Sequence, residues 1–161
     1  GITASVPVIR YAKHIGASDE RLYRALLVSD LVTIHQKTGI GRLSAYCGAV
    51  SAGCGAGAGI SYLLGGDYRA IAHTIVNAVA ILSGTICDGA KPSCAAKIAS
   101  AVEAGILGYY MYVNDQQFRG GDGIVAKGVE NTIRNVGLLA SQGMKQTDRV
   151  ILNIMTGDQC L

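Results

Sequence analysis

The sequence contains no tryptophan, one phenylalanine and two prolines, and charged residues make up only 16% of its 161 positions. The net charge is +3, and no basic run or basic patch interleaved with aromatic residues is present. Nucleic acid is therefore not an expected partner. The first residues also lack the charged stub, apolar core and cleavage site of a secretory signal peptide, so secretion is not indicated.

Strand-like alternation, internal repeats and low-complexity tracts are absent as well, whereas glycine is abundant, with 22 residues, and half of the chain is apolar. Small residues suit helices that pack closely, and apolar residues recur at helical spacing along most of the chain. A chain of this length can bury a substantial core. The sequence therefore predicts an all-α fold, a bundle of about six to eight helices with a cysteine-bearing loop, in a single domain over residues 1–161.

Caps and breakers divide the chain into expected helices. Ser18, followed by acidic residues, begins one helix, Asp67 caps another, and Pro92 suits a first turn. Asp122 can cap a later helix. The expected helical ranges are 3–15, 19–37, 43–66, 67–86, 92–105, 122–139 and 147–154, and 107–113 either continues the fifth helix or lies outside it. The buried face of the fifth helix is expected to comprise Ala95, Ile98, Ala99 and Val102.

Two uncharged stretches allow other interpretations. The glycine run 53–59 would suit a phosphate-cradling loop, although no β-branched strand precedes it, as a strand–loop–helix unit requires. Residues 43–66 and 70–87 reach the length of a membrane span, but glycines dilute the first and polar residues interrupt the second. We therefore expect helices inside a bundle, with no membrane partner.

Three cysteines, Cys47, Cys87 and Cys94, are the best candidates for metal chemistry. Thiolates select zinc, copper(I) or iron–sulfur clusters, and a thiolate set without histidine or carboxylate partners suits a cluster better than a zinc finger. Their spacing is not a standard ligand pattern, and on spacing alone a small buried side chain is the favoured interpretation of each cysteine. Five cysteines without a signal peptide favour a reducing compartment, and cytoplasmic localisation is expected.

Residues near these cysteines are candidates for binding a substrate. Arg42 and Lys91 could anchor a substrate carboxylate or could be ordinary solvated charges. Ser44 could hydrogen-bond a cluster sulfide or cap a helix. Cys54 suits a packing role better than a ligand role, and Cys160 is either exposed or a fourth ligand. The general base is not identified by the sequence.

Three segments carry a resemblance to a known family: 29–34, 39–48 and 86–95. They resemble the C-terminal part of L-cysteine desulfidases, which are grouped with serine dehydratase alpha-chain-like proteins. The resemblance extends over essentially the whole chain but only over the later portion of a family member. It implies that Cys47, Cys87 and Cys94 hold a [4Fe–4S] cluster. It also implies that the chain is a C-terminal fragment of a longer protein.

The resemblance further implies β-elimination of a small amino acid. L-cysteine would give pyruvate, ammonia and sulfide, and L-serine would give pyruvate and ammonia. With three cysteine ligands one iron stays open and can act as a Lewis acid on the leaving group. The chain alone is expected to be inactive without an N-terminal portion or partner subunit, and a homo-oligomer is a further option. The alternative is a non-catalytic helical assembly domain with unused buried cysteines.

Overall fold

The computed structural model describes residues 1–157, and these residues confirm the all-helical prediction. They form seven α-helices and one short π-helix, with an isolated antiparallel bridge between Tyr46 and Ile86. The helices are α1 (Ile2–His14), α2 (Asp19–Ile40), α3 (Gly48–Leu63), α4 (Tyr68–Leu82), α5 (Ser93–Val113), α6 (Val129–Leu138) and α7 (Lys145–Thr156), and the π-helix η1 (Leu139–Gly143) joins the last two.

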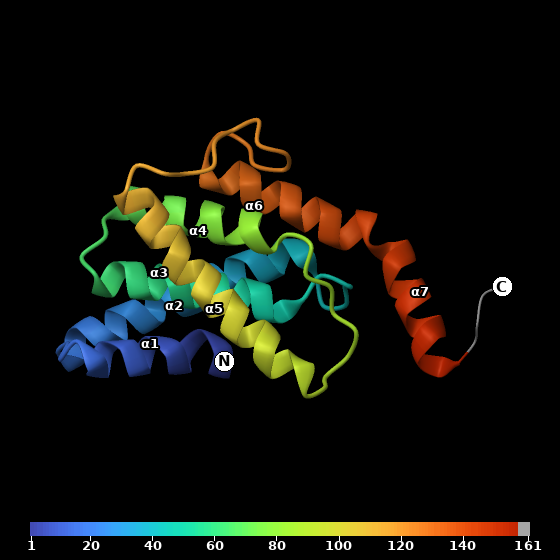
Figure 1. Ribbon diagram of the computed structural model, residues 1–161, viewed down its shortest axis with the longest axis horizontal. Coiled ribbons are helices and arrows are strands. Elements are labelled where there is room, and N and C mark those ends of the chain that lie inside the picture. The colour runs from blue at the N-terminus through green and yellow to red at the C-terminus, as the bar shows by residue number, and fades with distance from the viewer. Residues whose placement is uncertain (158–161) are drawn as a thin grey trace.

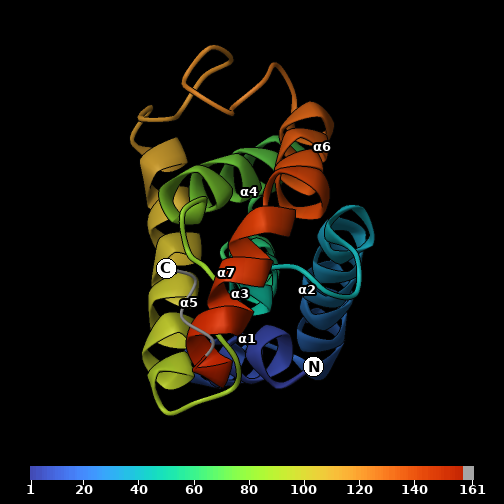
Figure 2. The ribbon, with the colours of Figure 1, turned by 90° about the vertical axis from the view of Figure 1, so that its right-hand side faces the viewer.

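Helix α3 forms the centre of the bundle and packs against α1, α2, α4 and α5 (Figures 1 and 2). Its glycines let neighbouring backbones approach closely. A Cβ at Gly57 would lie 2.5 Å from the Cα of Gly105, and a Cβ at Gly53 would lie 2.4 Å from the Cβ of Ala101. Helices α3 and α5 therefore cross with almost no side chain between them. The glycine run is thus the interior of a helix, which excludes the phosphate-loop interpretation.

Polar contacts fix the helices around this centre. Ser18 accepts a hydrogen bond from the backbone N–H of Arg21 and caps α2, and Asp67 caps α4 in the same way through Ala70. The Ser29 hydroxyl, which is fully buried, donates to the Ala4 carbonyl at 2.8 Å and ties α2 to α1. The two caps that the sequence predicts, Ser18 and Asp67, are therefore confirmed at the starts of α2 and α4.

Several expected boundaries are wrong. Helix α4 ends at Leu82 rather than near Ile86, because the chain leaves the helix to form the bridge. Helix α5 does not end near Gly105 but continues to Val113, which confirms the alternative in which 107–113 extends it. Helix α6 begins only at Val129, so that 122–128 is loop. Helix α1 starts at Ile2, one residue before the expected start at 3, and contains Pro7.

The expected buried face of α5 is wrong at two of its four positions, whereas Ile98 and Val102 are half-buried and Val102 packs against the core. Ala95 and Ala99 are exposed, and the fully buried positions of α5 are Ala101, Ala104, Gly105 and Gly108. The small residues face α3 and α4 because only they permit such close helix contacts. None of the helices within residues 1–157 combines the length and apolar composition that a membrane crossing needs.

Candidate cysteine site

The candidate site is built where two loops meet at one end of α3 and α4. The 41–47 segment enters α3, and the 83–92 segment leaves α4 and enters α5. The Cys47 N–H donates to the Thr85 carbonyl at 3.2 Å, and the Cys87 N–H donates to the Ala45 carbonyl at 2.6 Å. These two bonds flank the Tyr46–Ile86 bridge.

The bridge brings Cys47 and Cys87 together from positions far apart in the sequence. Cys47 directly follows Tyr46 and Cys87 directly follows Ile86, so the two cysteines are diagonal neighbours on the same face of the bridge. The Cα atoms of such neighbours are typically about 7–8 Å apart. Cys47 is buried, with 5% of its surface exposed, and the half-buried Cys87 packs against the same core cluster. The backbone therefore holds two of the predicted ligands in a fixed relation.

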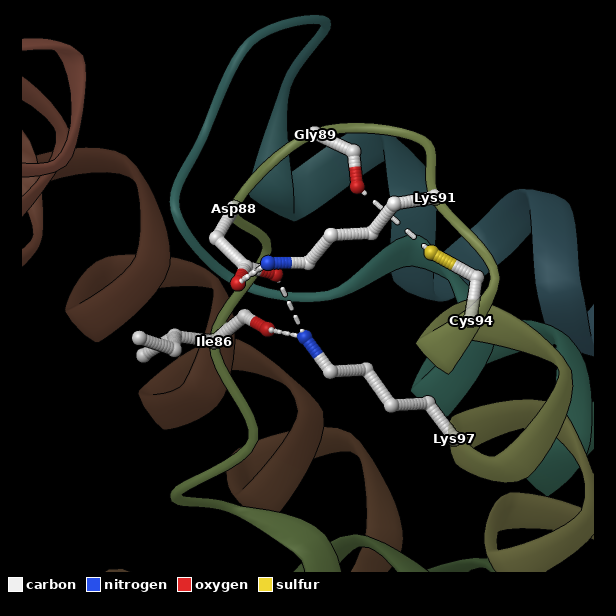
Figure 3. A network of polar contacts seen from close by, with 6 residues as sticks. All are labelled: Ile86, Asp88, Gly89, Lys91, Cys94 and Lys97. Atoms are coloured by element: carbon white, nitrogen blue, oxygen red, sulfur yellow. Dashed lines mark hydrogen bonds and ion pairs between the residues drawn. The ribbon is translucent and has the colours of Figure 1, made fainter. Parts of the chain in front are cut away.

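Cys94 lies in the first turn of α5, at the far end of the 83–92 segment, the cysteine loop. Its Sγ donates to the Gly89 carbonyl at 3.5 Å (Figure 3). The loop turns at Gly89, where φ is +91°, a value that favours glycine. Helix α7 covers this turn, since a Cβ at Gly89 would lie 3.1 Å from the Cε of Met155.

Asp88 is the centre of a charged network within this loop (Figure 3). Its carboxylate pairs with Lys91 and with Lys97, the latter at 2.7 Å, and the Lys97 ammonium also donates to the Ile86 carbonyl at 2.9 Å. Hydrogen bonds from Lys91 and then Lys97 lower the pKa of Asp88 to about 2. The network connects the start of α5 to the Tyr46–Ile86 bridge.

Lys97 also interacts electrostatically with two of the cysteines. Its hydrogen bond to Asp88 is the main cause of its raised pKa, and the negative charge of the Cys47 and Cys94 thiolates adds to it. The Lys97 ammonium group is therefore within electrostatic range of two of the three predicted ligands. The sequence analysis did not select Lys97. Its position three residues after Cys94, on the same face of a helix, was the available signal.

The donor types fit an iron–sulfur cluster, but the three thiols are not gathered in this conformation. Within residues 1–157, no three histidine, cysteine, aspartate or glutamate side chains are arranged to hold a metal ion. The set is nonetheless composed of thiols alone, beside a lysine that can offset thiolate charge.

The buried Tyr46 hydroxyl also has no hydrogen-bond partner in the described part of the chain. Burial, followed by the charges of Cys54 and Cys47, raises its pKa.

The predicted substrate residues lie around the same loops but in different settings. The Ser44 hydroxyl donates to the Ala140 carbonyl at 2.8 Å and accepts from the Tyr46 N–H at 3.0 Å, which fixes the loop before Cys47. Lys91 is paired with Asp88, and Arg42 is exposed beside a shallow pocket between Ile34 and Gly41. Their contacts to a substrate stay predictions.

Of the two remaining cysteines, the structure describes only Cys54. Cys54 is fully buried inside α3, and burial raises the pKa of its thiol to about 12, as a packing role predicts. Cys160 lies outside the described residues.

Comparison with known proteins gives consistent matches. A family model described as serine dehydratase alpha chain matches residues 1–153. A UPF0597 protein of Desulfitobacterium hafniense is 68% identical over 99% of this chain. UPF0597 proteins of Treponema denticola and Bacteroides fragilis are 51% and 45% identical over 98% and 99% of it. The chain spans 37% of the length of each of these relatives. No solved structure matches it.

Proposed function

Because the chain belongs to the serine dehydratase alpha chain family, we propose that it is the cluster-binding domain of an iron–sulfur lyase acting on L-cysteine or L-serine. The observation that carries this proposal is the backbone bridge that places Cys47 and Cys87 on one face, beside a lysine that also acts on Cys94. Cys47, Cys87 and Cys94 would hold a [4Fe–4S] cluster, whose open iron supplies Lewis-acid chemistry when bound.

The chain's own residues have separate roles in this proposal. The Tyr46–Ile86 bridge orients two ligands, and Lys97 offsets thiolate charge at Cys47 and Cys94. Arg42 or Lys91 would bind the substrate carboxylate, and Lys91 would have to exchange Asp88 for that carboxylate. The portion that the longer relatives possess in addition would complete the active site and supply the general base.

Metal analysis of the 161-residue chain tests the cluster. After anaerobic reconstitution with iron and sulfide, we expect about four irons per chain and the visible absorption of a cluster. Cys87→Ala should lose this iron. Cys54→Ala is the matched control, because this thiol is buried within α3 and should be dispensable for iron. Equal iron loss in both variants, or no stoichiometric iron in the unmodified chain, would reject the cluster.

A non-catalytic assembly domain is the second candidate function, and one observation favours it. Helix α2 exposes about 60% of each of four apolar side chains in a row, Tyr23, Leu27, Leu31 and Ile34. Such a row is typical of a surface that another polypeptide covers. Absence of cluster iron together with tight self-association would support assembly over catalysis.

A further inference from the structure

A second cavity lies away from the cysteines, between the first half of α4 and the loop that joins α5 to α6. Its volume is about 490 Å³, which is within the range of small-molecule sites. The loop, 114–128, lies above α4 in Figure 1, whereas the cysteine loop follows the opposite end of this helix. The cavity is therefore distinct from the candidate cysteine site.

Three cations line the cavity, namely Arg69, Arg119 and Lys127. No side chain within residues 1–157 forms an ion pair with any of them. The nearby carboxylate of Asp122 accepts the backbone N–H of Arg119 at 2.6 Å. Three side-chain cations without ion pairs, gathered at one cavity, create a positive potential that favours an anionic ligand.

Two residues that line the cavity each also carry a buried polar atom without a partner. Nδ1 of His73 and the side-chain oxygen of Gln117 form no hydrogen bond in the described part of the chain. The His73 ring is held by stacking on Tyr112, with centroids 5.0 Å apart and an interplanar angle of 11°. Half a turn of the Gln117 amide exchanges its oxygen for an NH₂ donor. Unpaired buried polar groups are costly, so a small shift of either side chain that lets a ligand pair with it is favoured.

The lowered pKa of His73 is consistent with a positive potential at the cavity. Burial, then the charges of Arg69 and Arg119, lower the pKa of its imidazole. Both guanidinium groups therefore act on this ring. An anion bound between them would offset their charge.

The remaining lining is largely apolar and includes Ala72, Val76, Phe118 and Val125. Free phosphate would leave this wall unused, whereas an organic acid could bury an apolar body against it. Arginine also matches a carboxylate with a two-pronged hydrogen-bond geometry.

We propose that this cavity binds a small organic carboxylate, with its head group between Arg69 and Arg119, next to the His73 ring, and its apolar body against Val76 and Phe118. The site is independent of the cysteine site and does not rest on the proposed lyase function.

Calorimetric titration of the 161-residue chain with benzoate tests the site. Benzoate combines a carboxylate with an apolar ring, and benzamide has the same shape without the charge. We expect saturable binding of one benzoate per chain, no saturable binding of benzamide, and weaker binding of inorganic phosphate. Arg69→Gln and Arg119→Gln should each weaken benzoate binding about tenfold or more, the usual effect of losing a hydrogen bond to a charged group.

Arg10→Gln is the matched control, because this exposed arginine lies on α1, which does not line the cavity. It should leave benzoate binding unchanged, and thermal unfolding of all three variants establishes that they are folded. An NMR titration provides a second readout, in which saturating benzoate should raise the pKa of His73. No saturable benzoate binding, equal weakening by Arg10→Gln, tighter binding of phosphate than of benzoate, or an unmoved His73 pKa would each overturn the proposal.

Discussion

Tyr46 carries a hydroxyl that is buried without a partner in the described residues, inside the core that also holds Cys47 and Cys54. Burying an unpaired hydroxyl costs free energy. We therefore expect Tyr46→Phe to raise the free energy of unfolding of the cluster-free chain by about 1 kcal/mol. Urea denaturation measures this change. A loss of stability would show that the hydroxyl has a partner in solution, and Tyr62→Phe, at a half-buried tyrosine of α3, is the control for the substitution itself.

His73 should titrate below its ordinary value of 6.5, because burial and the charges of Arg69 and Arg119 disfavour its protonated form. The unfolded chain takes up this proton near pH 6.5, and the folded chain takes it up only at lower pH. The contribution of His73 to stability is therefore present above pH 6.5 and is lost as the pH falls below it. NMR titration of the ligand-free chain measures the midpoint. Arg119→Gln should move it upward, and a midpoint at or above 6.5 in the unmodified chain would contradict this account.

Among the helices, the crossing of α3 and α5 depends on glycine. A Cβ at Gly57 would lie 2.5 Å from the Cα of Gly105, which neither backbone can accommodate without separation of the helices. We expect Gly57→Ala to lower the free energy of unfolding by about 2 kcal/mol or more. Gly48→Ala is the matched control, since no atom lies within 4 Å of its added Cβ and alanine favours helix. Denaturant unfolding distinguishes the two, and equal effects would contradict the close crossing.

The elements with local signals were predictable, and those determined by packing were not. Ser18 and Asp67 cap α2 and α4 as the sequence predicts, because capping depends on neighbouring residues alone. Gly105 was expected to end α5, yet it is retained inside the helix for the contact with Gly57. In the site, the long loop motifs predicted the family, whereas the role of Lys97 depends on a bridge between distant segments.

For the molecule as a whole, the row Tyr23, Leu27, Leu31 and Ile34 on α2 is an apolar surface that the described residues leave uncovered. Leu31 also borders a cavity of about 380 Å³ between α2, α4 and α6, so the apolar surface continues beyond the helix. The chain spans 37% of the length of its relatives. We infer that, in a protein as long as these relatives, the polypeptide beyond the 161 residues covers this row.

The 161-residue chain on its own should then associate with itself through this row, because exposed apolar surface of this extent favours burial between copies. We expect sedimentation velocity to show concentration-dependent oligomers. Leu27→Glu combined with Leu31→Glu should give a monomer with unchanged helical content, because both side chains are about 60% exposed. Leu107→Glu on α5, at a leucine that is 48% exposed, is the control and should leave association intact. A monomeric unmodified chain at all concentrations would show that the row does not need a polypeptide cover, which would also remove the main support for an assembly role.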